Sequence, residues 1–254
     1  MLSTGLTSIT FRQLPVDAVI ELAKECRLDG IEWGGDIHVP PGDLELASEV
    51  HAKTEAAGLT VCSYGAYFRC DDESGPLADV LDSARALAAP VIRVWAGRKG
   101  SADADSDYRA EVVEHLRRAV IAAKEVDITI ALEYHGGTLT DTQASAHQLL
   151  EEVGLPELKL YWQPRTGGTF EADLPELDAA LPHLSHVHAF HWVKKDDGHI
   201  DRRPFKEGIE AWREYLARIR KAEGERYIIF EFVRADEPEQ LIEDSQVLHD
   251  LLAS

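Results

Sequence analysis

Eight short apolar segments recur along the chain, each followed by a stretch with helical spacing, and this alternation limits the fold more than any other feature. The apolar segments have the length of buried strands and lie at residues 4–9, 28–33, 59–64, 90–95, 128–133, 158–162, 186–190 and 227–233. The helical patterns follow at residues 14–26, 44–57, 76–88, 108–124, 142–153, 175–181, 209–222 and 237–252. Regular alternation of this kind predicts a parallel sheet whose strands are joined by right-handed crossovers.

The number of these units selects one parallel-sheet architecture. Eight strand–helix units within 254 residues match the repeat number and size of a closed (β/α)8 TIM barrel. A doubly wound open sheet is the alternative, but no GxGxxG follows the first strand and no GxxxxGK[ST] motif occurs. No linker-like segment divides the chain, so we predict a single barrel domain over residues 1–254, with a long loop at residues 193–206.

Composition limits the partners and the compartment. The 46 acidic and 26 basic side chains give a formal net charge of −20, which repels a phosphate backbone and argues against nucleic acid. The three cysteines form no CxxC pair, which fits a reducing cytoplasm better than a disulfide framework. Neither a signal peptide nor a membrane-spanning run is visible. We expect a cytoplasmic protein that acts on a small molecule and not on a membrane, and the sequence leaves a homo-oligomer open.

Four successive strands in the second half of the chain end on a polar side chain. These residues are Glu133, Gln163, His188 and Glu231. In a barrel of this class, the carboxyl ends of the strands surround the active site. Carboxylate, amide and imidazole groups can together bind a divalent cation such as Mn²⁺, Mg²⁺, Co²⁺ or Zn²⁺. Their spacing carries no local motif, so each group could equally be a polar residue of the barrel mouth that bonds to backbone or water.

These segments resemble the xylose isomerase-like TIM-barrel superfamily, which comprises sugar phosphate isomerases, epimerases and their relatives. The likeness spans essentially the whole chain and lies in Gly-Ile-Glu-Trp at the second strand, Ala-Leu-Glu-Tyr-His at the fifth, His-Val-His at the seventh, Pro-Phe-Lys-Glu-Gly-Ile-Glu-Ala-Trp after it, and Ile-Phe-Glu-Phe-Val at the eighth. The resemblance implies one divalent metal held by Glu, Asp, His and Glu from the last four strands. Three of these positions are Glu133, His188 and Glu231 in this chain.

The second metal position departs from the family pattern. Gln163 stands where the family usually has Asp, and Thr166 stands where a His usually follows three residues later. A neutral amide can still donate one oxygen to a cation, but it removes a negative charge from the site. We therefore expect weaker metal binding and altered substrate contacts, as in a divergent relative of the ketose 3-epimerases.

The resemblance also implies a reaction. In members that isomerise or epimerise, two metal-bound glutamates, here Glu133 and Glu231, exchange a proton on the carbon next to a carbonyl through a metal-stabilised enediolate. We predict an isomerase or epimerase of a sugar, sugar phosphate or polyol. The alternatives are a lyase that uses the same chemistry, in the manner of inosose or dehydroshikimate dehydratases, and a carbohydrate-binding barrel that has lost turnover. Endonuclease IV-like repair is disfavoured because three metals need more ligands and the charge of −20 opposes DNA.

Further side chains near the strand ends are candidates for contact with the substrate. Arg93 could pair with a substrate carboxylate or phosphate, or with Glu32. Trp33, Trp95 and Trp192 could stack on a sugar ring or fill the barrel mouth. The complete set of predicted substrate contacts is Glu32, His38, Tyr67, Arg69, Arg93, Trp95, His135, His191 and Arg203.

Overall fold

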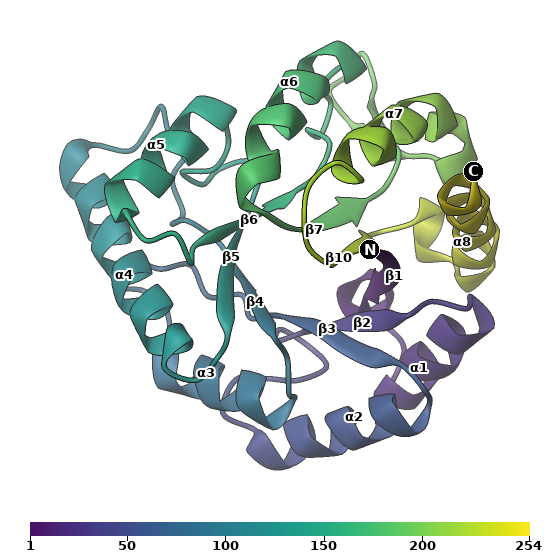
Figure 1. Ribbon diagram of the computed structural model, residues 1–254, viewed down its shortest axis with the longest axis horizontal. Coiled ribbons are helices and arrows are strands. Elements are labelled where there is room, and N and C mark those ends of the chain that lie inside the picture. The colour runs from purple at the N-terminus through teal and green to yellow at the C-terminus, as the bar shows by residue number, and fades with distance from the viewer.

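The computed structural model describes residues 1–254 and contains a closed barrel of eight strands inside a ring of helices (Figure 1). The barrel strands are β1 (Leu2–Thr7), β2 (Gly30–Gly34), β3 (Thr60–Gly65), β4 (Val91–Val94), β5 (Thr129–Glu133), β6 (Lys159–Trp162), β7 (Leu184–Ala189) and β10 (Arg226–Phe230). Neighbouring strands pair in parallel and in chain order, and β1 closes the barrel on β10. The predicted (β/α)8 barrel is confirmed.

The helices cover the outer face of the barrel (Figure 1). They are α1 (Val16–Glu25), α2 (Leu44–Ala56), α3 (Leu77–Ala86), α4 (Ser106–Lys124), α5 (Gln143–Val153), α6 (Phe170–Ala180), α7 (Ile209–Ile219) and α8 (Pro238–Ala253). Polar side chains start several of them, because Asp43, Asp105 and Thr142 each accept a hydrogen bond from a backbone N–H in the first turn. Each predicted helix is present with similar bounds, except at α6.

Two segments differ from the sequence-based expectation. Helix α6 begins at Phe170, before the predicted start at residue 175, because Thr169 caps it by accepting from Ala172 N–H. The predicted long loop contains a short antiparallel hairpin of β8 (Trp192–Lys194) and β9 (Ile200–Arg202). Gly198 allows its turn, with φ +84° and an N–H that donates to Lys195 O. Strands of three residues are too short for a periodic sequence signal.

The alternation of side chains along the strands separates two apolar regions. Trp33 and Trp162 point outward into the layer between barrel and helices, where Trp33 Nε1 donates to Thr54 Oγ1 of α2 and Trp162 packs on Tyr215 of α7. Inside the barrel lies a smaller apolar cluster, composed of Cys62, Val91, Ala131, Tyr161 and Ile229. Ala131 and Ile229 each precede a strand-end glutamate by two residues, so this cluster forms a floor directly below the polar strand ends.

The helices and the cysteines were checked for membrane spans and disulfides. No helix in the structure combines the length and the apolar character needed to cross a bilayer. The cysteines Cys26, Cys62 and Cys70 are all buried, and none of them forms a disulfide.

Candidate metal centre and active-site cavity

The four strand-end residues converge at the carboxyl end of the barrel. Glu133 ends β5, Gln163 follows β6, His188 belongs to β7 and Glu231 follows β10. The Nδ1 atom of His188 lies 3.1 Å from Gln163 Oε1, 3.5 Å from Glu231 Oε2 and 3.8 Å from Glu133 Oε1. All four side chains are buried. We call this group the strand-end cluster.

The spacing of the strand-end cluster suits a divalent cation. Ligands held about 2.1 Å from a Mg²⁺ or Mn²⁺ ion lie about 3.0 Å apart when adjacent and about 4.2 Å apart when opposite. The three distances from His188 Nδ1 fall within this range, and the Glu133, His188 and Glu231 ligand atoms all lie within 4.8 Å of one another. Gln163 Nε2 donates to Tyr134 O at 2.7 Å, which turns Gln163 Oε1 toward the cluster. The donor set therefore fits one cation.

A buried carboxylate fixes the orientation of the imidazole. Glu32 is fully buried, its Oε1 lies 3.2 Å from His188 Nε2, and its Oε2 accepts from Ser63 Oγ at 2.6 Å. A carboxylate on the far nitrogen is the usual way to orient a metal-binding histidine, and it leaves Nδ1 for the cluster. Although burial acts in the opposite direction, Glu231 and Glu32 raise the pKa of His188 to about 9. A cation at Nδ1 would take the place of the proton held there.

Arg93 links Glu32 to Glu133 beneath the cluster. Its Nη1 donates to Glu133 Oε2 at 2.5 Å and its Nε donates to Glu32 Oε1 at 3.2 Å. Burial opposes this charge, but Arg93 and His188 still hold the pKa of Glu32 well below its ordinary value. The guanidinium fits because residue 65 is glycine, since a Cβ there would lie 2.5 Å from Arg93 Nη2.

The two glutamates of the cluster have unequal surroundings. Glu133 Oε2 accepts from Arg93 and also from Trp95 Nε1 at 2.7 Å, so one of its oxygens is fully engaged. Glu231 has no comparable donor, and its nearest cationic group is His188. Burial raises the pKa of Glu231, although His188 acts against this increase. Glu231 is therefore the carboxylate more disposed to accept a proton, whereas Glu133 is held in place.

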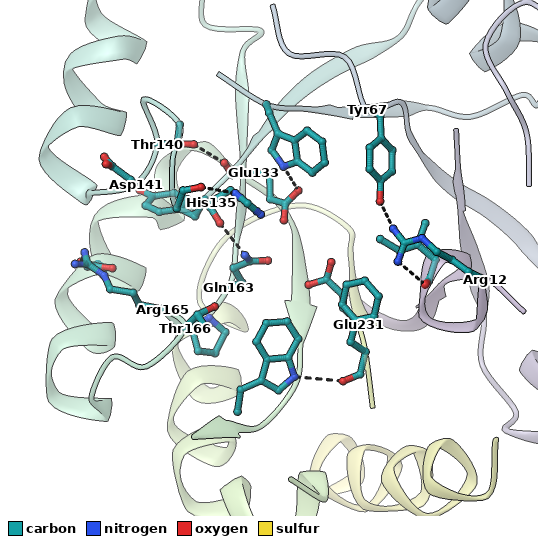
Figure 2. Close-up of a pocket in the computed structure, with 18 residues that line it drawn as sticks. Arg12, Tyr67, Glu133, His135, Thr140, Asp141, Gln163, Arg165, Thr166 and Glu231 are labelled. Carbon is teal, nitrogen blue, oxygen red and sulfur yellow. Dashed lines mark hydrogen bonds and ion pairs between the residues drawn. The ribbon is translucent and has the colours of Figure 1, made fainter. Parts of the chain in front are cut away.

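A cavity of about 600 Å³ opens above the cluster, and Figure 2 shows Glu133, Gln163 and Glu231 in its wall. Three of the predicted substrate contacts, Tyr67, Trp95 and His135, also line it. The aromatic rings form one side, because Tyr67 packs edge-on against Trp95 with ring centroids 4.8 Å apart. Trp192, which was predicted to stack on a sugar ring or to fill the barrel mouth, and Thr166, where altered substrate contacts were expected, also lie in the wall. Residues that we did not predict as contacts complete it, among them Arg12, Tyr134, Thr140, Asp141, Arg165, Glu176 and Phe232.

The other predicted contacts lie outside the cavity wall. They are Glu32, His38, Arg69, Arg93, His191 and Arg203. Glu32 and Arg93 bond to each other below the cluster. His38 Nε2 bonds to Leu14 O at 3.0 Å, and the Arg69 guanidinium lies 4.2 Å from the Trp95 ring centroid, over a wall residue. Exposed Arg203 pairs with Glu207 at 2.7 Å. Contact of these six residues with a substrate stays a prediction.

Most of the unpredicted wall residues lie in the segments that follow barrel strands. Arg12 follows the short helix η1 (Ser8–Phe11) after β1, Asp141 lies in the loop after β5, and Arg165 lies in the loop after β6. In a barrel of this class the loops after the strands build the site together with the strand ends. A polar residue shortly after a predicted strand was therefore the only sequence feature that could have identified these wall residues. The sequence does not show which of these polar side chains point into the cavity.

The fold and the sequence together place the chain in a family. The profile of the xylose isomerase-like TIM barrel family matches residues 20–251, so the chain belongs to this family. A curated relative, 3-dehydroshikimate dehydratase of Bacillus anthracis, is 42% identical over 69 residues, a match that spans 27% of this chain and 25% of the relative.

Solved structures agree over nearly the full length. The probable 3-DHS dehydratase AsbF of Bacillus anthracis has a TM-score of 0.80 at 22% identity and covers 97% of this chain and 98% of its own. A xylose isomerase-like TIM barrel protein of Mycobacterium smegmatis in complex with magnesium has a TM-score of 0.75 at 17% identity, with coverages of 99% and 97%. The 3-keto-D-glucoside 4-epimerase YcjR of E. coli has a TM-score of 0.71 at 17% identity and covers 100% of both chains. At these identities the likeness establishes the fold.

Proposed function

We propose that this protein is a divalent-metal-dependent enzyme that removes a proton from the carbon next to a carbonyl group in a polyhydroxylated compound. The supporting observation is the unequal hydrogen bonding of Glu133 and Glu231. Glu231 accepts the proton, because no strong donor occupies its carboxylate. Glu133, held by Arg93 and Trp95, keeps its orientation. A cation held by the strand-end cluster would stabilise the negative charge that develops on the carbonyl oxygen.

We propose dehydration as the overall reaction, with a cyclic hydroxyketone such as 3-dehydroshikimate as the substrate. The match to the Bacillus anthracis dehydratase supports this outcome. His135 is exposed to the cavity beside Trp95, with Nδ1 2.6 Å from Gly136 O. The Nδ1–H group donates to that carbonyl and leaves Nε2 to act on the substrate.

The protons and bonds balance within this site. Glu231 takes the proton from the carbon next to the carbonyl, and the protonated His135 gives a proton to the hydroxyl on the following carbon. The C–O bond breaks, a C=C bond forms and water leaves. Loss of one water from 3-dehydroshikimate yields a dihydroxybenzoate, whose aromatic ring makes the step favourable.

Epimerisation or isomerisation of a ketose is the second candidate. It is supported by the position of Glu133 and Glu231 in one cluster, because two carboxylates near one carbon could remove a proton from one face and return it to the other. The overall reaction then depends on the substrate: a hydroxyl on the following carbon that can leave favours dehydration.

Incubation in D2O tests the proposal and separates the two outcomes. Protein with added Mn²⁺ is mixed with 3-dehydroshikimate or with ketohexoses, and the mixture is followed by NMR and mass spectrometry. We expect loss of water from the first substrate, and Glu231→Gln should lower the rate by about 10²–10⁴-fold. The matched control is Glu237→Gln at the N-cap of α8, which should leave the rate unchanged. Deuterium in recovered ketose without water loss favours the epimerase, and wild-type activity of Glu231→Gln overturns the assigned base.

A further inference from the structure

Arg12 forms one end of the active-site cavity. The residue follows η1 and lies in the cavity wall, and 41% of its side chain is exposed. Figure 2 shows Arg12 at one end of the cavity and Arg165 at the other, with Glu231 between them. A molecule that is bound at the strand-end cluster can therefore reach the Arg12 guanidinium.

Four contacts hold this guanidinium in one orientation. Its Nε donates to Asp36 Oδ2 at 2.9 Å, and its Nη1 donates to Ile9 O at 3.2 Å. Its Nη2 donates to the Tyr67 hydroxyl, and its central carbon lies 5.3 Å from the ring centroid of Phe232, in the segment after β10. A guanidinium has five N–H donors, and these contacts use three of them, so two remain for a ligand. Such a fixed donor pair loses little conformational freedom when it binds an anion.

The two ends of the cavity wall carry different charges. Arg165 forms an ion pair with Glu176, and both residues line the cavity together with Asp141, so this end is negative overall. The carboxylate that pairs with Arg12 belongs to Asp36, which does not line the cavity. The wall at Arg12 therefore presents a cation without a carboxylate beside it. An anionic group of a ligand is attracted to this end and repelled from the other.

The substrate class proposed above includes an anionic group. In 3-dehydroshikimate, a carboxylate is attached to the ring carbon opposite the carbon that loses its proton. When the carbonyl lies at the strand-end cluster, this carboxylate points away from the reacting carbon. A divalent cation would offset the charges of Glu133 and Glu231, so the cluster itself would not exclude an anionic ring. Arginine is the side chain best suited to bind a carboxylate, because its planar donors match the two oxygens.

We infer that Arg12 binds the carboxylate of the substrate and thereby selects an anionic ring over an uncharged one. The inference rests on the proposed function for the identity of the ring. Arg12 takes no part in the proton transfer. It positions the ring, so that the carbon next to the carbonyl faces Glu231. The substrate class is then a cyclic hydroxyketone that carries a carboxylate, and a neutral sugar lacks the group that Arg12 recognises.

Calorimetric titration of the Mn²⁺-loaded protein tests this role with two probes of nearly the same shape. The first is 3,4-dihydroxybenzoate, the product of the proposed dehydration, and the second is 3,4-dihydroxybenzamide, in which a neutral amide replaces the carboxylate. Hydrogen bonds between charged groups are strong, but the exposure of Arg12 lowers their contribution, so we expect the acid to bind about 10-fold more tightly than the amide.

Three variants assign this preference to one side chain. The ratio of the two affinities should fall below about 3-fold in Arg12→Gln, whereas Arg12→Lys, which keeps the charge, should retain a ratio above about 3-fold. Arg213→Gln is the matched control, because Arg213 is an exposed arginine of α7 that pairs with Glu210 at 2.9 Å. It should keep the ratio of the wild type.

Several outcomes would overturn the role of Arg12. These are equal or undetectable binding of the acid and the amide by the wild type, and an unchanged ratio in Arg12→Gln, as expected if the carboxylate binds the cation instead. Loss of the ratio in Arg165→Gln but not in Arg12→Gln would place the carboxylate at the other end of the cavity. Circular dichroism melting of each variant confirms that it is folded. Binding does not require turnover, so a preference that depends on Arg12 supports the carboxylate site even where the proposed dehydration is not observed.

Discussion

Replacing Glu32 with glutamine tests the buried charges that support the candidate metal centre. Glu32 Oε1 lies 3.2 Å from both Arg93 Nε and His188 Nε2, and the side chain is fully buried. At an effective dielectric constant near 20, two unit charges at this separation attract by about 5 kcal/mol. Relief of the desolvation of Glu32 offsets part of this loss. Because removal of one partner from a buried pair costs about 3–5 kcal/mol, we expect Glu32→Gln to lower the free energy of unfolding by about 3 kcal/mol.

Two measurements follow from this value. For a chain of this size, about 3 kcal/mol corresponds to a fall in Tm of roughly 6–12 °C, measured by circular dichroism without added metal. Mn²⁺ affinity, measured by calorimetry, should fall about 10–100-fold because Glu32 orients His188. The matched control is Glu49→Gln, which breaks an exposed ion pair with Lys53 at 2.9 Å and should cost less than about 1 kcal/mol. A Tm within about 2 °C of the wild type, together with unchanged Mn²⁺ affinity, would refute this reasoning.

Two further predictions concern packing and pH. Gly65→Ala places a Cβ 2.5 Å from Arg93 Nη2 and should lower the free energy of unfolding in urea by about 1–3 kcal/mol. Gly75→Ala, which has open space around it, is the control and should leave this free energy unchanged. Equal effects of the two substitutions would contradict the steric clash with Arg93. Burial raises the pKa of Asp244 to about 6. The folded state therefore binds this proton more tightly than an unfolded carboxyl near 3.9, so the contribution of Asp244 to stability should fall as pH rises from about 4 to 6, by up to about 2–3 kcal/mol. Asp244→Asn should lack this component, and identical pH profiles of the two proteins in urea unfolding would count against it.

The alternation of apolar segments was sufficient to predict the barrel, because the eight barrel strands are mostly buried and each surrounding helix buries apolar side chains against them. Hydrophobic periodicity did not predict the start of α6 or the β8–β9 hairpin, which depend on local hydrogen bonds. The start of α6 depends on Thr169 as the N-cap, and the chain passes through Pro175 without ending the helix. The β8–β9 hairpin is held by backbone pairing between three-residue strands, which leaves no periodic pattern.

The sequence predicted which residues lie at the strand ends. It did not predict which of their side chains reach the cavity wall. Period-two alternation turns Glu32, Arg93 and Glu133 toward the barrel interior alike, yet Arg93 bonds to both glutamates and lies outside the cavity wall. Tyr134 was missed for a different reason. Alternation after Glu133 predicts that it faces the helices, and it does pack in the main apolar core, but β5 ends at Glu133 and Tyr134 also lines the cavity. Such positions depend on loop geometry, which no short sequence pattern specifies.

The central claim is that Glu133, Gln163, His188 and Glu231 surround one divalent cation. Anomalous diffraction from crystals grown with Mn²⁺ tests it most directly. We expect a single strong peak about 2.0–2.3 Å from one ligand atom of each of these four side chains. The structure also contains a second, more exposed group of candidate ligands, Asp72, Glu111 and His115. A peak confined to that group, or no peak between Glu133 and His188, would contradict the account.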